Sequence, residues 1–105
     1  MCTLKVSSSS DPGATAGAIA NGVRERGLSE IQVIGPRAVN QAVKAIAVAR
    51  GYLAASGVDL YCVPRFATIR VADGDQEKTA IHFSIRPRHE ITGIAMSRPD
   101  GATRF

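Results

Sequence analysis

The stretch EIQVIGPRAVNQAVKAIAVARGYL, residues 30–53, joins a short apolar strand to a long amphipathic helix. Its first six residues predict a strand, and the alternation of residues 30–33 places Ile31 and Val33 on one side of it. Gly35 and Pro36 end the strand and open the helix, because proline is well accommodated at the first helical position. Apolar residues at i, i+3, i+4 and i+7 spacing then predict the core-facing surface of this helix: Val39, Ala42, Val43, Ile46, Ala49 and Leu53.

A second strand–helix unit precedes this stretch. Residues 3–8 alternate in polarity and predict a strand, with Leu4 and Val6 facing the core and Lys5 facing away from it. A polar loop of four serines, residues 7–10, follows it. Asp11 is a typical helix N-cap and Gly27 a typical helix C-terminus, so we expect a helix between them. Its inner stripe is made of small residues and should approach the sheet closely: Ala16, Ile19, Ala20 and Val23.

The C-terminal half is rich in β-forming residues. Residues 58–72 and 78–86 predict two strands, and Asp73-Gly74-Asp75 between them is a strong turn signal for a hairpin. Pro64 lies inside the first of these strands and therefore predicts a bulge or an edge strand.

The predicted order of elements is β-α-β-α-β-β. Strands joined through helices should be parallel by right-handed crossovers. The fold class expected is therefore α/β, a two-layer sandwich of two helices on one mixed four-stranded sheet. We expect one domain over residues 1–87 and a C-terminal tail over residues 88–105, either flexible or carrying one short extra element.

Composition restricts the class of protein. The chain has 105 residues, of which 45% are apolar, which suits one soluble domain. Its two cysteines, Cys2 and Cys62, are too few for a disulfide framework or a zinc site. We find no signal peptide and no apolar run long enough to span a bilayer, so we expect a cytoplasmic protein with no membrane partner. The net charge of +4 is compatible with a polyanion partner.

The junction between residues 34 and 41 is the most informative candidate site. A helix N-terminus after a strand leaves free N–H groups suited to an anion, and Arg37 adds a fork of donors that matches a phosphate. The junction lacks the glycines of a dinucleotide loop and the Lys-Ser/Thr ending of a P-loop. The alternative is a tight turn followed by a solvated arginine. The serine loop should lie at the same edge of the sheet, where ligands of open α/β sheets bind.

Catalytic chemistry finds little support in the sequence. His82 lies within a predicted strand and His89 in the predicted tail, and neither is near a recognisable nucleophile. Cys62 lies in an apolar strand and is interpreted as an inert core thiol. No HxxxH, CxxC or paired-carboxylate pattern is present. We therefore expect a protein that is not an enzyme and has no metal or other cofactor.

Several blocks together resemble one known family. Residues 38–52, AVNQAVKAIAVARGY, are the most specific block, and residues 16–20, 24–27 and 30–35 extend the similarity. The chain closely resembles the stage V sporulation protein S family over roughly residues 3–87. This resemblance implies a small bacterial, cytosolic regulator of sporulation, of a kind also found in bacteria that do not sporulate.

That family is similar in fold to the Alba chromatin and RNA-binding proteins, which share this order of elements and act as dimers. Alba proteins bind nucleic acid with lysines in the first βα loop, an Arg-Ala dipeptide opening the second helix, and a long basic hairpin. Arg37-Ala38 matches the dipeptide. Ser9-Ser10 stands where the lysines are expected, and residues 73–77 make the hairpin tip acidic. The resemblance therefore implies a smaller and weaker basic surface.

The leading prediction is a dimeric or higher homo-oligomeric regulator that binds DNA or RNA. Its candidate residues are Arg37 and Lys44 for phosphate charge, Asn40 and Gln41 for polar contacts, and Ser9 and Ser10 for hydrogen bonds from the loop. One alternative is a developmental regulator that acts through protein–protein assembly without nucleic acid. A further alternative is a small anionic metabolite bound at residues 35–37.

Overall fold

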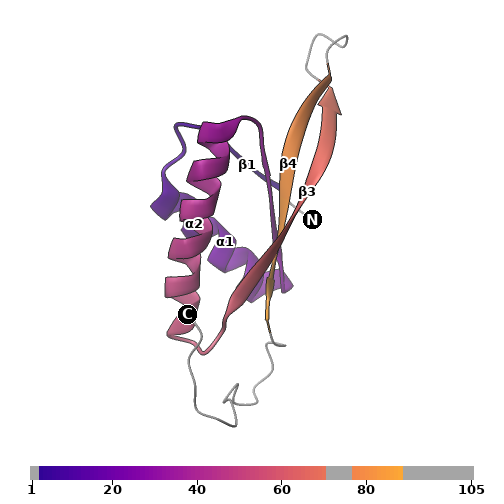
Figure 1. Cartoon of the computed structure of the whole chain (residues 1–105). Helices are drawn as coiled ribbons and strands as arrows, with labels where there is room; N and C mark the ends of the chain where they lie inside the picture. Colours follow the sequence, from indigo (N-terminus) through magenta and orange to yellow (C-terminus); the bar gives the residue numbers. More distant parts are fainter. Residues whose placement is uncertain (1–2, 71–76, 89–105) are drawn as a thin grey trace.

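The computed structural model describes residues 3–70 and 77–88 and has two layers (Figure 1). Its elements are β1 (Thr3–Val6), α1 (Pro12–Arg26), β2 (Ser29–Val33), α2 (Pro36–Ala54), β3 (Leu60–Arg70) and β4 (Glu77–Pro87). Both helices lie on one face of a single mixed sheet (Figure 1). The predicted fold class and order of elements are confirmed.

The four strands are arranged in the order β1-β2-β4-β3. β1 and β2 pair in parallel, as expected for strands joined through a helix, and β4 is antiparallel to both of its neighbours. β3 is an edge strand with an unbroken register against β4, so Pro64 marks an edge position. Proline has no backbone N–H to donate to a neighbouring strand. An edge strand tolerates it because one side of that strand has no neighbour.

The β3–β4 pair is longer than the rest of the sheet. β2 pairs only with residues 81–85 of β4, whereas β3 pairs with all of β4. The end of the pair that β2 does not reach, residues 67–70 of β3 and 77–80 of β4, therefore projects beyond the helices as a two-stranded arm (Figure 1).

Local capping chemistry explains where the helices begin and end. The Asp11 carboxylate accepts a hydrogen bond of 2.9 Å from the Ala14 backbone N–H, which confirms the predicted N-cap of α1. Gly27 ends α1 with a φ of 82°, a left-handed conformation that favours glycine. Gly35, with a φ of 89°, turns the chain from β2 into Pro36 at the start of α2.

The small inner face of α1 allows the close approach to the sheet that was expected. Its four predicted stripe residues are all buried. The Ser29 hydroxyl on β2 donates a hydrogen bond of 2.8 Å to the Ile19 carbonyl oxygen within α1. A Cβ placed on Gly22 would lie only 2.1 Å from the Ser29 hydroxyl oxygen. The close packing of α1 on β2 therefore depends on glycine at position 22.

The prediction for the core face of α2 was wrong at Val43 and missed two buried alanines. Val43 is 50% exposed, and Ala38 and Ala45 are buried although they were not assigned to the core. α2 packs mainly against α1, so its buried stripe is rotated toward that helix. Val43 lies on the outer flank of the stripe as a result.

A buried carboxylate ties the end of α2 to the strands that follow. Asp59, whose side chain is 5% exposed, accepts hydrogen bonds from the Arg50 guanidinium at 2.8 and 3.1 Å. Its second oxygen lies 3.2 Å from Nε of Arg88, just after β4. The Leu60 backbone N–H donates to the oxygen that Arg50 binds, at 2.9 Å. One acidic side chain thus connects α2, β3 and the end of β4.

Some expectations concern residues outside the described ranges. The predicted turn at residues 73–75 and nearly all of the predicted tail lie there, and so do Cys2 and His89. The division into a domain and a tail therefore stays a prediction. In the described ranges, no helix combines the length and the apolar character needed to cross a bilayer.

Candidate nucleic-acid interface

One hydrogen bond brings the two predicted parts of the site together. The side-chain amide of Gln41 in α2 donates a bond of 2.9 Å to the backbone carbonyl oxygen of Ser10 in the loop after β1. Gln41 is half-buried because of this contact. The loop and the first turns of α2 therefore form one continuous surface at the carboxyl end of β1 and β2.

The exposed side of α2 carries the other candidate residues. Arg37, Asn40 and Lys44 are all exposed, and with Gln41 they follow the spacing of neighbours on one helix face. α2 contains no acidic residue. Among the described residues, neither Arg37 nor Lys44 has an ion-pair partner. This α2 stripe is therefore positive and available to an anion.

The serines of the loop are occupied mainly by each other. The Ser10 hydroxyl accepts a bond of 2.9 Å from the Ser7 backbone N–H, and the Ser9 backbone N–H donates to the Ser7 hydroxyl at 3.3 Å. The Ser7 and Ser9 hydroxyls also lie 3.1 Å apart. Ser9 and Ser10 thus shape a compact turn, and Ser9 remains exposed on it.

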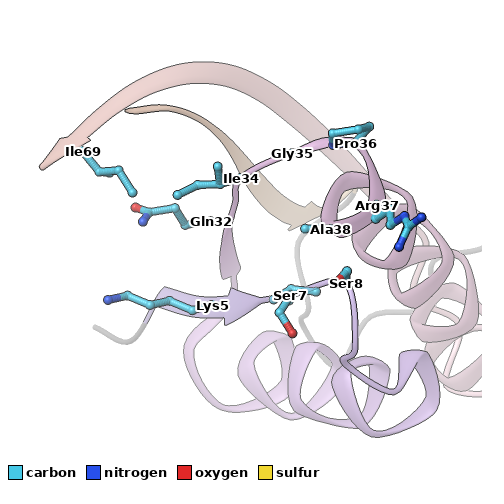
Figure 2. A pocket seen from close by; sticks show the side chains of 11 residues that line it. Lys5, Ser7, Ser8, Gln32, Ile34, Gly35, Pro36, Arg37, Ala38 and Ile69 are labelled. Carbon is cyan, nitrogen blue, oxygen red and sulfur yellow. The ribbon is translucent and has the colours of Figure 1, made fainter. Parts of the chain in front are cut away.

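A hollow of about 640 Å³ includes the predicted junction at residues 35–37 in its lining, but its extension toward Lys5, Gln32 and Ile69 was not predicted. It extends from the serine loop and the start of α2 to the arm, and its wall includes Lys5, Gln32, Ile34 and Ile69 (Figure 2). In Figure 2, Gln32, Ile34 and Ile69 point toward one region, whereas Arg37 points away from it over α2. The hollow and the α2 stripe therefore adjoin at Arg37, which lines one end of the hollow while its guanidinium extends over α2.

Part of this hollow has a signal in the sequence. The alternation of residues 3–6 places Lys5 away from the core, and the parallel register sets it opposite Gln32. Ile69 has no such signal, because its position depends on β4 lying between β2 and β3.

The described part of the arm carries side chains of both charges. Arg70 and Glu77 form an exposed pair, with Nη2 and Oε2 3.4 Å apart, and Lys78 follows on the same strand as Glu77. Arg65 is exposed nearer the body of the protein. The described part of the arm can therefore add positive charge close to the hollow.

Cys62 on β3 and His82 on β4, which were considered as catalytic candidates, lie outside the α2 stripe. Cys62 is half-buried, and desolvation raises the pKa of its thiol above the ordinary value, which disfavours the reactive thiolate. The His82 side chain is 7% exposed, and its Nε2 lies 3.8 Å from Oε1 of Glu30 on the neighbouring strand.

Comparison with known families supplies one finding. The family model described as stage V sporulation protein S (SpoVS) matches residues 2–88. The matched range contains every element of the fold and all of the candidate residues.

Proposed function

The chain belongs to the stage V sporulation protein S family, and we propose that it is a cytoplasmic, sporulation-related regulator that binds DNA or RNA as a homodimer. The proposal assigns it a binding role and no catalytic step. The binding surface consists of Arg37, Asn40, Gln41 and Lys44 on α2 with Ser9 and Ser10 in the first βα loop.

The observation that carries this proposal is the bond between Gln41 and Ser10. It holds an exposed polar loop against a helix that has cations and no carboxylates. The nearest acidic group in the loop, Asp11, is engaged as the N-cap of α1. The surface therefore combines fixed hydrogen-bonding groups with unpaired positive charge, which is the combination that phosphate recognition requires.

The small number of cations on this surface limits the expected affinity for nucleic acid. Arg37 and Lys44 lie about 10 Å apart along the helix axis, at 1.5 Å per residue, so each can meet a different phosphate. Two phosphate contacts per protomer give modest affinity, and counterion release makes that affinity fall with added salt. A homodimer doubles the contacts and so strengthens the binding.

The test is a titration of duplex DNA, single-stranded DNA and RNA at several salt concentrations. The double variant Arg37→Ala/Lys44→Ala should bind more weakly, and its plot of log affinity against log salt should lose about 2 units of slope for each protomer in contact. The matched control is Arg24→Ala/Arg26→Ala, which removes the same charge from the C-terminal end of α1. Equal losses in both double variants would exclude the proposed surface.

A second candidate function rests on exposed apolar side chains. Phe66 is 77% exposed on the edge strand β3, and Val63 on the same strand is 52% exposed. Such residues suit contacts with another protein or another copy of this chain. If wild type binds no nucleic acid and assembles with concentration on a sizing column, and Phe66→Ser prevents assembly, then regulation through protein contacts alone is the better account.

A further inference from the structure

The hollow beside the α2 stripe has a composition unlike that of the stripe. Lys5 and Gln32 are register partners on β1 and β2, so they share the sheet face that the helices do not cover. Ile34 continues the same alternation and is 42% exposed. Ile69, on the arm, completes the wall opposite them (Figure 2). This end of the hollow therefore has apolar walls with one amide and one ammonium group between them, while Ser7, Ser8 and Arg37 line the other end.

The polar groups of the hollow are available to a ligand. Among the described residues, the Gln32 side-chain amide has no hydrogen-bond partner and Lys5 has no ion pair. None of the described lining residues is acidic. The volume falls within the roughly 300–1,000 Å³ of sites that take small molecules or parts of larger ones. The hollow thus suits a flat, partly apolar group that has hydrogen-bonding edges and a nearby negative charge.

We propose that this hollow binds one unstacked base of a single-stranded nucleic acid. The Gln32 amide donates to and accepts from the base edge, while Ile34 and Ile69 contact the faces of the base. Lys5, the register partner of Gln32, pairs with the adjoining phosphate. This inference rests on the proposed nucleic-acid function and adds to it a preference for single strands and for base identity.

Two arguments favour a single strand over a duplex. A base in a duplex is stacked and paired, so its faces and pairing edge are closed to a concave site, whereas a single strand can turn a base outward. The hollow is also continuous with the proposed phosphate surface, because Arg37 and the serine loop line its other end. A chain whose base occupies the hollow can therefore extend toward α2, which a free nucleotide cannot do.

The test compares base preference with overall affinity. Fluorescence anisotropy is measured with single-stranded homopolymers of each base, as RNA and as DNA, and with a duplex of equal length. Wild type should prefer single strands and should distinguish the four bases. Gln32→Met keeps the side-chain volume but removes the amide, so it should lose roughly ten-fold in affinity for the preferred base. Its affinity for the duplex, which depends on Arg37 and Lys44, should stay within about two-fold of wild type.

Two further variants keep the result interpretable. Ile69→Ser removes one apolar wall on the exposed arm and should weaken single-strand binding for all bases. Thr68→Val alters the neighbouring exposed position outside the hollow and should leave both affinities unchanged. Thermal unfolding of each variant checks that it is folded.

The three outcomes separate this inference from the function on which it rests. If wild type binds nucleic acid through Arg37 and Lys44 but Gln32→Met keeps the wild-type base preference, the base site is wrong and the proposed function stands. If mononucleotides bind in a Gln32-dependent way while single strands do not, the single-stranded ligand is wrong. If wild type binds no nucleic acid at all, the proposed function fails and the base site fails with it.

Discussion

The side-chain nitrogen of Gln41 lies 2.9 Å from the backbone carbonyl oxygen of Ser10, and this bond joins positions 31 residues apart in the chain. The other hydrogen bonds of the serine loop are local, between residues two or three positions apart. Gln41 is thus the side chain that holds the loop against α2. The sequence predicted Gln41 as a ligand contact, and the structure gives it a positioning role.

Replacing Gln41 should separate these two effects. Gln41→Met removes the bond but no charge, so we expect a loss of roughly 0.5–1.5 kcal/mol in the free energy of unfolding and faster hydrogen exchange in the serine loop. The neighbouring change Asn40→Ala removes an exposed amide and should alter stability by less than about 0.5 kcal/mol. Urea denaturation and amide exchange measure both. Equal stability losses in the two variants would show that the bond to Ser10 contributes nothing.

The contact between α1 and β2 predicts opposite effects for two glycines. Gly22→Ala places a methyl group where the Ser29 hydroxyl and the Leu28 carbonyl oxygen already lie, and should destabilise the protein by about 1–3 kcal/mol. Gly17 is in the same helix, and a methyl group added there would meet no heavy atom within 4 Å, so Gly17→Ala should stabilise by about 0.5–1 kcal/mol. Thermal unfolding tests the pair. A stable Gly22→Ala variant would mean that the helix can move away from the sheet at little cost.

The Cys62 thiol should show the effect of its burial. Because desolvation raises its pKa, the folded state holds the thiol proton more tightly than the unfolded state does. The resulting stability is present below the unfolded pKa and is lost as the pH rises through the folded pKa. We expect slow labelling by a thiol reagent in a Cys2→Ser background, with a rate profile shifted to higher pH than in urea. Identical folded and unfolded profiles would contradict this.

Local signals explain why most of the fold could be predicted. Asp11, Gly27 and the Gly35-Pro36 pair act through the backbone of their immediate neighbours, so their effect does not depend on the rest of the molecule. The alternation in β1 and β2 likewise reports a buried face of each strand. These features established the element types, the bounds of α1 and the start of α2, whereas most strand ends differ from the prediction by one or two residues.

Features that depend on packing between distant elements could not be predicted from these local signals. The spacing of apolar residues in α2 predicts that the helix has a buried stripe. Which residues that stripe includes depends on how α2 packs against α1 and the sheet, and Val43 was misassigned for that reason. The hollow depends on the arm, because Ile69 reaches Gln32 and Ile34 only through the placement of β4 between β2 and β3. The role of Gln41 also required knowing where the Ser10 carbonyl lies.

The buried carboxylate at the end of α2 gives the last prediction. Asp59→Asn keeps the size of the side chain and an acceptor for the Leu60 N–H, but it removes the charge that pairs with Arg50 and Arg88. Because hydrogen bonds to a buried charged group are the stronger kind, we expect a loss of about 1.5–3 kcal/mol in the free energy of unfolding.

The matched control is the exposed pair on the arm. Glu77→Gln removes the charge opposite Arg70, where both side chains are more than half exposed, at 65% and 58%. Solvent screens such a pair, so its loss should change stability by less than about 1 kcal/mol. Urea denaturation of the two variants measures both changes in the free energy of unfolding. If Glu77→Gln lowers the free energy of unfolding as much as Asp59→Asn does, burial does not explain the effect of Asp59. The attachment of α2 to β3 and β4 must then depend on apolar packing around Leu53 and Leu60.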